Sequence, residues 1–323
     1  MKNKSLMFIL GAVLIGLLGV LALSMFVFQD RGYSLPALKE FKNLNKIEVK
    51  KSTNTVLFTQ SADKWTVTPP NDTADKTVVD AMVIKLKQMK LTSLLSYGEN
   101  LEKYNLDTNA RVEVTAWQDK KVVAHFYLGK TSPTYSHSYV QLPGNKNVYE
   151  MAGNLPETFD KNSIDSFRSK DVTSVAMDDV QEIAFVEGGR ETMFVRNTST
   201  ITNLTATNDK TNFGKPKTEI ITVWKTPKGS AANVKTMEEL LTRICKLNAV
   251  SFAGEKQEEP KGVLAAYRMK TKLGDVDVTV VRKDTNNNYL VSTAGRKSFF
   301  HVNETTIKDI FDKAKAVKAE AGY

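Results

Sequence analysis

The chain has 323 residues, which suggests about two domains, and its 41% hydrophobic and 25% charged residues exclude disordered, collagen-like and multi-span membrane classes. The net charge of +9 is not gathered into an Arg/Lys stripe with interleaved aromatic residues, so we expect no nucleic-acid partner. One cysteine, Cys245, and three dispersed histidines exclude an internal disulfide and a Cys/His metal site.

The first feature along the chain is residues 5–28, an uninterrupted run of uncharged, mostly apolar residues. As a helix it would measure about 36 Å, which exceeds the roughly 30 Å hydrocarbon core of a bilayer. Lys2 and Lys4 precede it, so the positive-inside rule puts the N-terminus in the cytoplasm. The sequence predicts a single-pass anchor over residues 1–30, a linker over 31–46, and a protein of the bacterial cytoplasmic (inner) membrane whose bulk is extracytoplasmic.

A cleaved signal peptide is the competing interpretation of the same run. A secretory apolar region normally covers about 7 to 15 residues and ends at an Ala-x-Ala-like site. This run is longer and offers only Ala22-Leu23-Ser24, which favours retention as an anchor.

Small residues form a stripe on the predicted anchor. Ser5, Ala12, Gly16 and Gly19 fall close together when plotted at about 100° per residue. Small side chains let a second membrane helix approach closely, so the stripe is a candidate helix-helix contact. The alternative is that these glycines reflect ordinary membrane-helix composition, because the strict Gly-x-x-x-Gly spacing is absent.

The rest of the chain repeats one pattern. An amphipathic period runs over residues 79–89 and returns over 237–247, a shift of 158 positions. Trp65 and Trp224 stand at equivalent places ahead of the two periods, where we expect core anchors. Two hairpin patterns follow each period, and each copy is predicted to end in a helical segment, around residues 155–167 or 306–317. A tandem duplication explains this order.

These patterns predict an α+β fold with two tandem repeats of antiparallel sheet plus amphipathic helix, over residues 47–170 and 171–323. The connections are too short for crossover helices, which excludes a parallel Rossmann-like sheet. The second repeat carries an insertion near residues 197–217, rich in Thr, Asn, Lys and Gly, which we expect to be a long loop or an added hairpin.

Three short motifs resemble a known family. In order they are Tyr104-Asn105-Leu106-Asp107, Leu128-Gly129 and Phe167-Arg168-Ser169-Lys170-Asp171. With the anchor and the tryptophan strands, the chain resembles an uncharacterised bacterial family, domain of unknown function 4340 (DUF4340). Asn105 stands where that family usually has glycine, and asparagine is the next-best residue for a left-handed turn.

The resemblance implies an accessory role. Members look like membrane-anchored companions of ABC transporters of the gliding-motility type. The implied partners are therefore the transporter permease and its extracytoplasmic partner subunit. The resemblance supplies no catalytic residue, cofactor or metal site.

Two features that could indicate catalysis have simpler structural explanations. Ser61 and Lys64 fit the S-x-x-K spacing of serine acyl enzymes, but they lie between extended segments, where a solvated hairpin turn is favoured. Cys245 lies on the apolar side of a predicted helix, so we expect a buried, unreactive thiol. We therefore predict no catalytic, cofactor-binding or metal-binding residues.

One hairpin supplies a candidate contact patch. Matching apolar faces predicts a tip at Gln118-Asp119-Lys120 and sets Glu113 across from His125. That pair is expected to be a weak surface ion pair rather than a catalytic one. Trp117, His125 and Tyr127 share the solvated face and form the candidate extracytoplasmic contact patch. A second covering layer is the simpler alternative for these aromatic residues.

The sequence thus predicts a non-catalytic, membrane-anchored accessory subunit of an ABC-type transport or envelope-remodelling complex, acting through extracytoplasmic protein contacts. The alternative is an independent envelope module that binds glycan or peptidoglycan through Trp117 and Tyr127. A hydrolase is a third class, which the absence of nucleophile-base and metal patterns disfavours.

Overall fold

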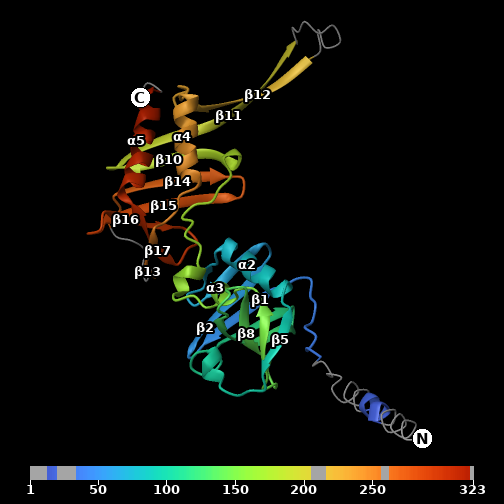
Figure 1. The fold of residues 1–323 in the computed structure, drawn as a ribbon. Helices are drawn as coiled ribbons and strands as arrows, with labels where there is room; N and C mark the ends of the chain where they lie inside the picture. Colours follow the sequence, from blue (N-terminus) through green and yellow to red (C-terminus); the bar gives the residue numbers. More distant parts are fainter. Residues whose placement is uncertain (1–12, 20–33, 205–215, 256–261, 321–323) are drawn as a thin grey trace, which may run out of the picture.

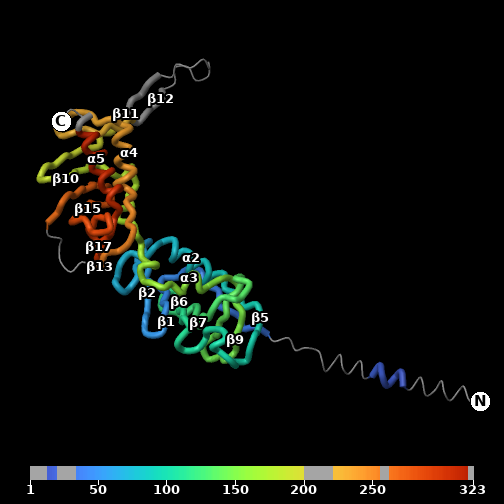
Figure 2. The backbone as a smooth tube through the Cα atoms, turned by 60° about the vertical axis from the view of Figure 1, so that its left-hand side comes forward, coloured from blue at the N-terminus to red at the C-terminus, as the bar shows by residue number. Residues whose placement is uncertain are grey.

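The computed structural model describes residues 13–19, 34–204, 216–255 and 262–320. These residues form two β-rich units joined at a narrow waist (Figures 1 and 2). The prediction of an α+β chain is wrong, because the described chain is mostly antiparallel strand in two large sheets with few helices. Residues 155–167, for example, yield one short helix, α3 (Pro156–Phe159), and one 3₁₀ turn, η2 (Ile164–Phe167).

The first unit is built on a nine-stranded sheet of order β4-β3-β2-β1-β6-β7-β8-β9-β5. All its neighbouring strands pair antiparallel. The strands are β1 (Lys46–Lys51), β2 (Asn54–Ser61), β3 (Lys64–Thr68), β4 (Asp72–Thr73), β5 (Leu91–Ser96), β6 (Val112–Gln118), β7 (Lys121–Thr131), β8 (His137–Gln141) and β9 (Val148–Ala152).

The second unit is built on an eight-stranded sheet of order β12-β11-β10-β14-β15-β16-β17-β13. Its neighbouring strands are also antiparallel. The strands are β10 (Val180–Glu187), β11 (Arg190–Leu204), β12 (Pro216–Lys225), β13 (Ser251–Glu255), β14 (Ala265–Thr271), β15 (Gly274–Lys283), β16 (Asn288–Thr293) and β17 (Ser298–Asn303).

Both sheets follow one topology once the two-residue strand β4 is set aside. On one side of each sheet, three consecutive strands form a meander, β1–β3 or β10–β12. On the other side, four later strands continue the sheet, β6–β9 or β14–β17. The strand after the amphipathic helix, β5 or β13, closes the far edge. This equivalence is what the predicted tandem duplication requires.

The inserted segment of the second unit is an extension of a hairpin. Strands β11 and β12 stay paired as far as Leu204 and Pro216. They project beyond the rest of the sheet (Figure 1). Residues 205–215 lie outside the described residues.

Two helices carry the amphipathic periods seen in the sequence. Helix α2 (Lys76–Lys87) begins at Asp75, whose carboxylate accepts hydrogen bonds from two backbone N–H groups of the first turn. Helix α4 (Val234–Cys245) begins at Asn233, whose side chain caps the N–H of Thr236. Each buries its apolar stripe against its own sheet.

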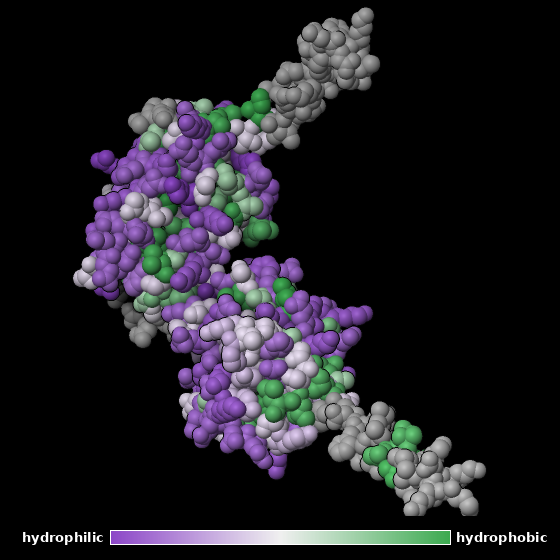
Figure 3. Space-filling view, viewed as in Figure 1, coloured by the Kyte–Doolittle hydropathy of each residue, from purple (hydrophilic) through white to green (hydrophobic). Residues whose placement is uncertain are grey.

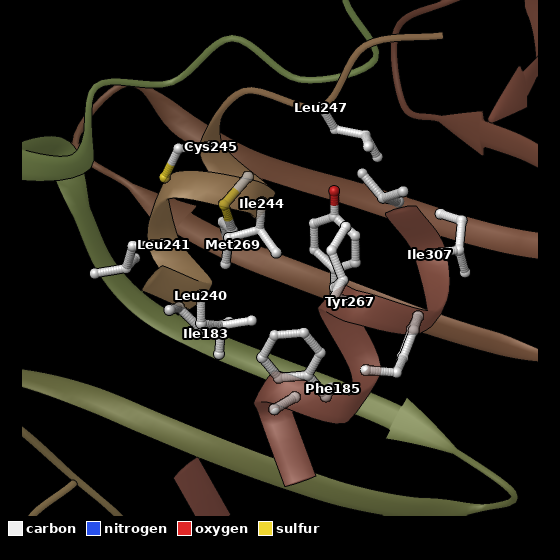
Figure 4. Packing of buried hydrophobic residues seen from close by; sticks show 14 of the residues in the cluster. Ile183, Phe185, Leu240, Leu241, Ile244, Cys245, Leu247, Tyr267, Met269 and Ile307 are labelled. Carbon is white, nitrogen blue, oxygen red and sulfur yellow. The ribbon is translucent and has the colours of Figure 1, made fainter. Parts of the chain in front are cut away.

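The core of the second unit lies between its sheet and helices α4 and α5 (Glu304–Glu320) (Figure 4). Phe185 of β10 packs at 5.9 Å from the ring of Tyr267 on β14. Leu240 and Ile244 of α4 and Ile310 of α5 are fully or almost fully buried. Each such side chain contributes on the order of 1.5–3 kcal/mol of hydrophobic stabilisation.

The predicted transmembrane anchor is corrected by the structure. Among the described residues, no helix has the length and apolar character needed to span a membrane. The described residues 13–19 are helical, and their apolar side chains are exposed (Figure 3). Gly16 and Gly19 are among these residues, and a Cβ added at either would meet nothing within 4 Å. Ser5 and Ala12 lie outside the described residues.

The register of the β6–β7 hairpin also differs from the prediction. The tip is the two-residue turn Asp119-Lys120, and Glu113 pairs with Tyr127 rather than with His125. Over most of the hairpin the observed pairing is shifted by two residues from the predicted pairing. Because the shift is an even number, each side chain stays on its predicted face. An irregularity between Ala116 and Trp117 absorbs one residue near the tip.

Candidate functional site

The waist between the two units is closed by a buried cluster of three charged residues, which we call the junction cluster: Asp72, Arg168 and Arg296. Asp72 lies on β4, Arg168 follows η2 in the connecting segment, and Arg296 lies in the turn between β16 and β17. Their side chains are 1%, 6% and 11% exposed. Three segments from distant parts of the chain therefore meet around one carboxylate.

Both oxygens of Asp72 accept hydrogen bonds from arginine. Oδ1 accepts from Nε of Arg296 at 2.5 Å, and Oδ2 accepts from Nη2 of Arg168 at 2.8 Å and from Nη2 of Arg296 at 3.2 Å. Charge-assisted bonds of this kind are among the strongest in proteins. The carboxylate is saturated and cannot serve as a base or a metal ligand without breaking the junction.

The two guanidinium groups extend the cluster to both units. Arg296 donates to the backbone oxygens of Ser169 at 2.7 Å and Asp171 at 2.8 Å. Arg168 donates to Asp165 at 2.7 Å and to the hydroxyl of Ser298 on β17. Each arginine therefore contacts residues on both sides of the waist.

Aromatic rings of the second unit cover the arginines. The guanidinium of Arg168 lies 3.7 Å from the ring centroid of Phe252 on β13, and that of Arg296 lies 4.9 Å from Phe300 on β17. The Nε of Arg168 is buried without a hydrogen-bond partner among the described residues. The cluster is therefore shielded from water on the side of the second unit.

The electrostatics of Asp72 follow from these contacts. Burial alone would raise the pKa of its carboxyl group. The hydrogen bonds from Arg296 and Arg168 outweigh burial and lower the pKa below the ordinary aspartate value. Asp72 is charged at neutral pH, so the junction carries its ion pairs there.

The predicted contact patch lies elsewhere, on the outer face of the first sheet. Trp117 is on β6, His125 and Tyr127 are on β7, and all three are partly buried. The rings of His125 and Tyr127 meet edge-on with centroids 5.8 Å apart. Glu113 Oε1 lies 2.8 Å from His125 Nε2, so this pair forms diagonally despite the shifted register.

Cations already cover one face of each large ring in the patch. Lys46 Nζ lies 4.2 Å from the centroid of Trp117, and the Arg111 guanidinium lies 3.8 Å from that of Tyr127. Stacking on a sugar would have to use the opposite faces or displace these cations. The arrangement favours a mixed polar and aromatic protein contact over glycan stacking.

The motif at residues 104–107 packs closely against Gly129 of strand β7. Tyr104 ends the 3₁₀ turn η1 (Leu101–Tyr104), and Asn105 takes the left-handed conformation expected of it, with φ 55° and ψ 38°. Leu106 is fully buried. A Cβ on Gly129 would lie 2.1 Å from the backbone oxygen of Tyr104, so glycine is needed there for the close approach of strand and turn.

Sequence reasoning found part of the junction cluster. It singled out the motif at residues 167–171, which contains Arg168, but as a family feature and not as a site. Asp72 and Arg296 were missed, because no periodicity links residues 224 positions apart. The nearest signal was the turn residues preceding each of them, Pro70-Asn71 and Ala294-Gly295.

The remaining thiol is buried, as the sequence predicted. Cys245 is 3% exposed in the core of the second unit, and burial raises the pKa of its thiol to about 11. At pH 8 we expect it to react with a disulfide reagent about a hundredfold more slowly in the native protein than in denaturant, because the thiolate is the nucleophile. Leu273→Cys, at a position 90% exposed, is the control and should react at once. Rapid labelling of native Cys245 would contradict the buried placement.

Comparison with known proteins identifies the family. The family model described as "Domain of unknown function (DUF4340)" matches residues 65–270, more than half of the chain, so the chain belongs to this family. The match covers Asp72 and Arg168 and ends before Arg296. No curated protein and no solved structure matches the chain.

Proposed function

We propose that this DUF4340 protein is a non-catalytic accessory subunit of an ABC-type transport or envelope-remodelling complex. Its two sheet units, held in a fixed orientation, contact the permease and its extracytoplasmic partner. The observation that carries the proposal is the junction cluster, in which the buried carboxylate of Asp72 binds Arg296 of the second unit and Arg168 of the connecting segment, besides the N–H of Thr73. A protein built to hold two surfaces at a fixed relation suits a role that transmits or restrains movement of its partners.

The choice of partner rests on the family resemblance and on the sequence. Members of the family resemble companions of ABC transporters. The apolar run preceded by Lys2 and Lys4 supports export of the chain across the inner membrane. The cation-covered aromatic patch around Trp117 and Tyr127 offers a surface suited to protein contact.

Affinity purification of the full chain from membranes in mild detergent, followed by mass spectrometry, tests the proposal. We expect transporter subunits to co-purify with the wild-type chain. Asp72→Ala should reduce their recovery several-fold, because it loosens the relation between the two contacting units. Asp80→Ala, which removes an exposed carboxylate of the same unit, should not. Recovery of the wild-type chain without transporter subunits would contradict the proposal.

A further inference from the structure

A groove of about 880 Å³ opens in the first unit beside the waist. It is lined by the end of β1, the start of β2, the turn at Pro69-Pro70 after β3, and the segment from α3 to Arg168. Its size lies within the range of sites that hold small ligands or short peptide segments. Of its lining residues only Arg168 belongs to the junction cluster, and the others have no role assigned so far.

One wall of the groove is an open strand edge. Gln60 N–H donates to Asn45 O at 2.9 Å, so even-numbered residues of β2 direct their backbone groups toward β1 and odd-numbered ones toward β3. Strand β3 ends at Thr68, which pairs with Leu57. The backbone of Thr55 therefore faces the groove, and no strand of the described chain pairs with that side of it.

The chain itself does not continue the sheet there. Pro69 and Pro70 follow β3 directly, and proline has no N–H to offer to a neighbouring strand. Thr55 is exposed, and it keeps its donor and acceptor available at the groove wall. An incoming extended segment can use both.

The floor of the groove is apolar. Val49, Phe159 and Phe167 are buried beneath it, at 5%, 1% and 3% exposure. Val56 and Ile164 are partly buried and pack against the same core. Alternate side chains of an extended segment would bury apolar area here, as the two-residue period of a strand requires.

The charges around the groove favour an acidic occupant. Lys51 is paired with Asp160 at 2.7 Å, which neutralises that part of the rim. Lys161 is partly buried and makes no ion pair with the described residues. Arg168 also lines the groove, but its charge is compensated by the carboxylates of Asp72 and Asp165. Among the described residues, Lys161 therefore supplies the unpaired positive charge of the groove.

We propose that this groove binds an extended peptide segment that adds a strand to β2 at Thr55 and places an acidic residue beside Lys161. The inference rests on the proposed function only in that the occupant comes from a partner protein. The segment would present apolar residues to the floor and a carboxylate to Lys161. Main-chain bonds give affinity in this mode of recognition, and the side-chain alternation gives specificity.

Fluorescence anisotropy with the purified full chain tests the groove without any transporter. The probes are a labelled heptapeptide of alternating valine and glutamate, its valine and lysine counterpart, and a glutamate peptide with an N-methylated backbone. We expect the glutamate peptide to bind at least tenfold more tightly than the lysine peptide. The N-methylated peptide should bind at least tenfold more weakly, because it has lost its strand donors.

Two variants locate the binding site. Lys161→Glu should weaken binding of the glutamate peptide about tenfold and strengthen binding of the lysine peptide. The control, Lys120→Glu, makes the same charge change at the exposed tip of the β6–β7 hairpin and should alter the binding of neither peptide. Thr55→Pro should abolish binding, because it removes the donor at an unpaired edge where proline is tolerated. Far-ultraviolet circular dichroism checks that each variant is folded.

No binding of the glutamate peptide up to about 1 mM would overturn the groove assignment, since a Kd near 1 mM corresponds to a binding free energy of only about −4 kcal/mol. Binding that survives both Lys161→Glu and Thr55→Pro would also overturn it. Either result leaves the co-purification test untouched, so failure of the groove and failure of the accessory role are distinguishable.

Discussion

Asp72→Ala is expected to lower the free energy of unfolding by about 3–5 kcal/mol, because it leaves two buried guanidinium groups without their counter-ion. Arg168 and Arg296 are 6% and 11% exposed, so water cannot replace the lost carboxylate fully. Urea unfolding followed by circular dichroism measures the change. The transition should also become broader or split, since the substitution separates two units that each have their own core.

The matched control is Asp80→Ala on helix α2. Asp80 forms an ion pair with Lys76 at 2.6 Å, but its side chain is 52% exposed. Exposed pairs contribute roughly 0–1 kcal/mol, so this variant should unfold almost like the wild type. Equal effects of the two substitutions would contradict a stabilising junction.

The effect of Asp72→Ala should depend on pH in one direction. The pKa of Asp72 is lowered in the folded protein, so its contribution is fully present above the unfolded-state pKa of 3.8. It is lost as the pH falls through the lower folded-state pKa. The difference between wild type and variant should therefore be constant from pH 7 to about pH 4 and shrink below that. A difference that shrinks between pH 7 and pH 5 would assign the effect to another group.

Gly129→Ala is expected to have the second largest effect, a loss of about 2–4 kcal/mol in the free energy of unfolding. The added Cβ would lie 2.1 Å from the backbone oxygen of Tyr104 and 3.0 Å from Cγ of Leu106. Tyr104 ends η1 and Leu106 is fully buried, so neither neighbour moves freely. Thermal or urea unfolding measures the loss.

Lys130→Ala is the control for Gly129→Ala. It changes the next residue of the same strand, whose side chain is exposed, and should shift the free energy of unfolding by less than about 0.5 kcal/mol. A loss below about 1 kcal/mol for Gly129→Ala would show that η1 can retreat from β7 at little cost.

The two amphipathic helices were predictable because their period is local. The buried residues of α4 recur at the spacing that a helix of 3.6 residues per turn demands. Tertiary packing agrees with that local signal in both units. The same reasoning failed for residues 155–167, where Pro156 starts a helix that lasts one turn.

Strand faces were predictable and strand register was not. Side chains alternate with a period of two, so a shift of two residues between β6 and β7 leaves every side chain on the same face. The apolar pattern cannot distinguish the two registers. The tight turn at Asp119-Lys120 decides between them, with φ 57° at Asp119.

The junction cluster could not be predicted from the sequence for a related reason. Its pairing links Asp72 to Arg296, and nothing local to either residue indicates the other. Only the placement of the second unit against the first brings them together. The groove could not be predicted either. Its wall is an unpaired backbone edge at Thr55, and no pattern of side chains in the sequence indicates which backbone groups stay unpaired.

A spin-label distance measurement tests the central claim, that the junction cluster fixes the two units relative to each other. Labels at Lys120→Cys in the first unit and Leu273→Cys in the second are both exposed, and the buried Cys245 should stay unlabelled. We predict one narrow distance distribution for the otherwise wild-type chain and a clearly broader one after Asp72→Ala. A broad distribution with the junction intact, or a narrow one that Asp72→Ala leaves unchanged, would contradict the account.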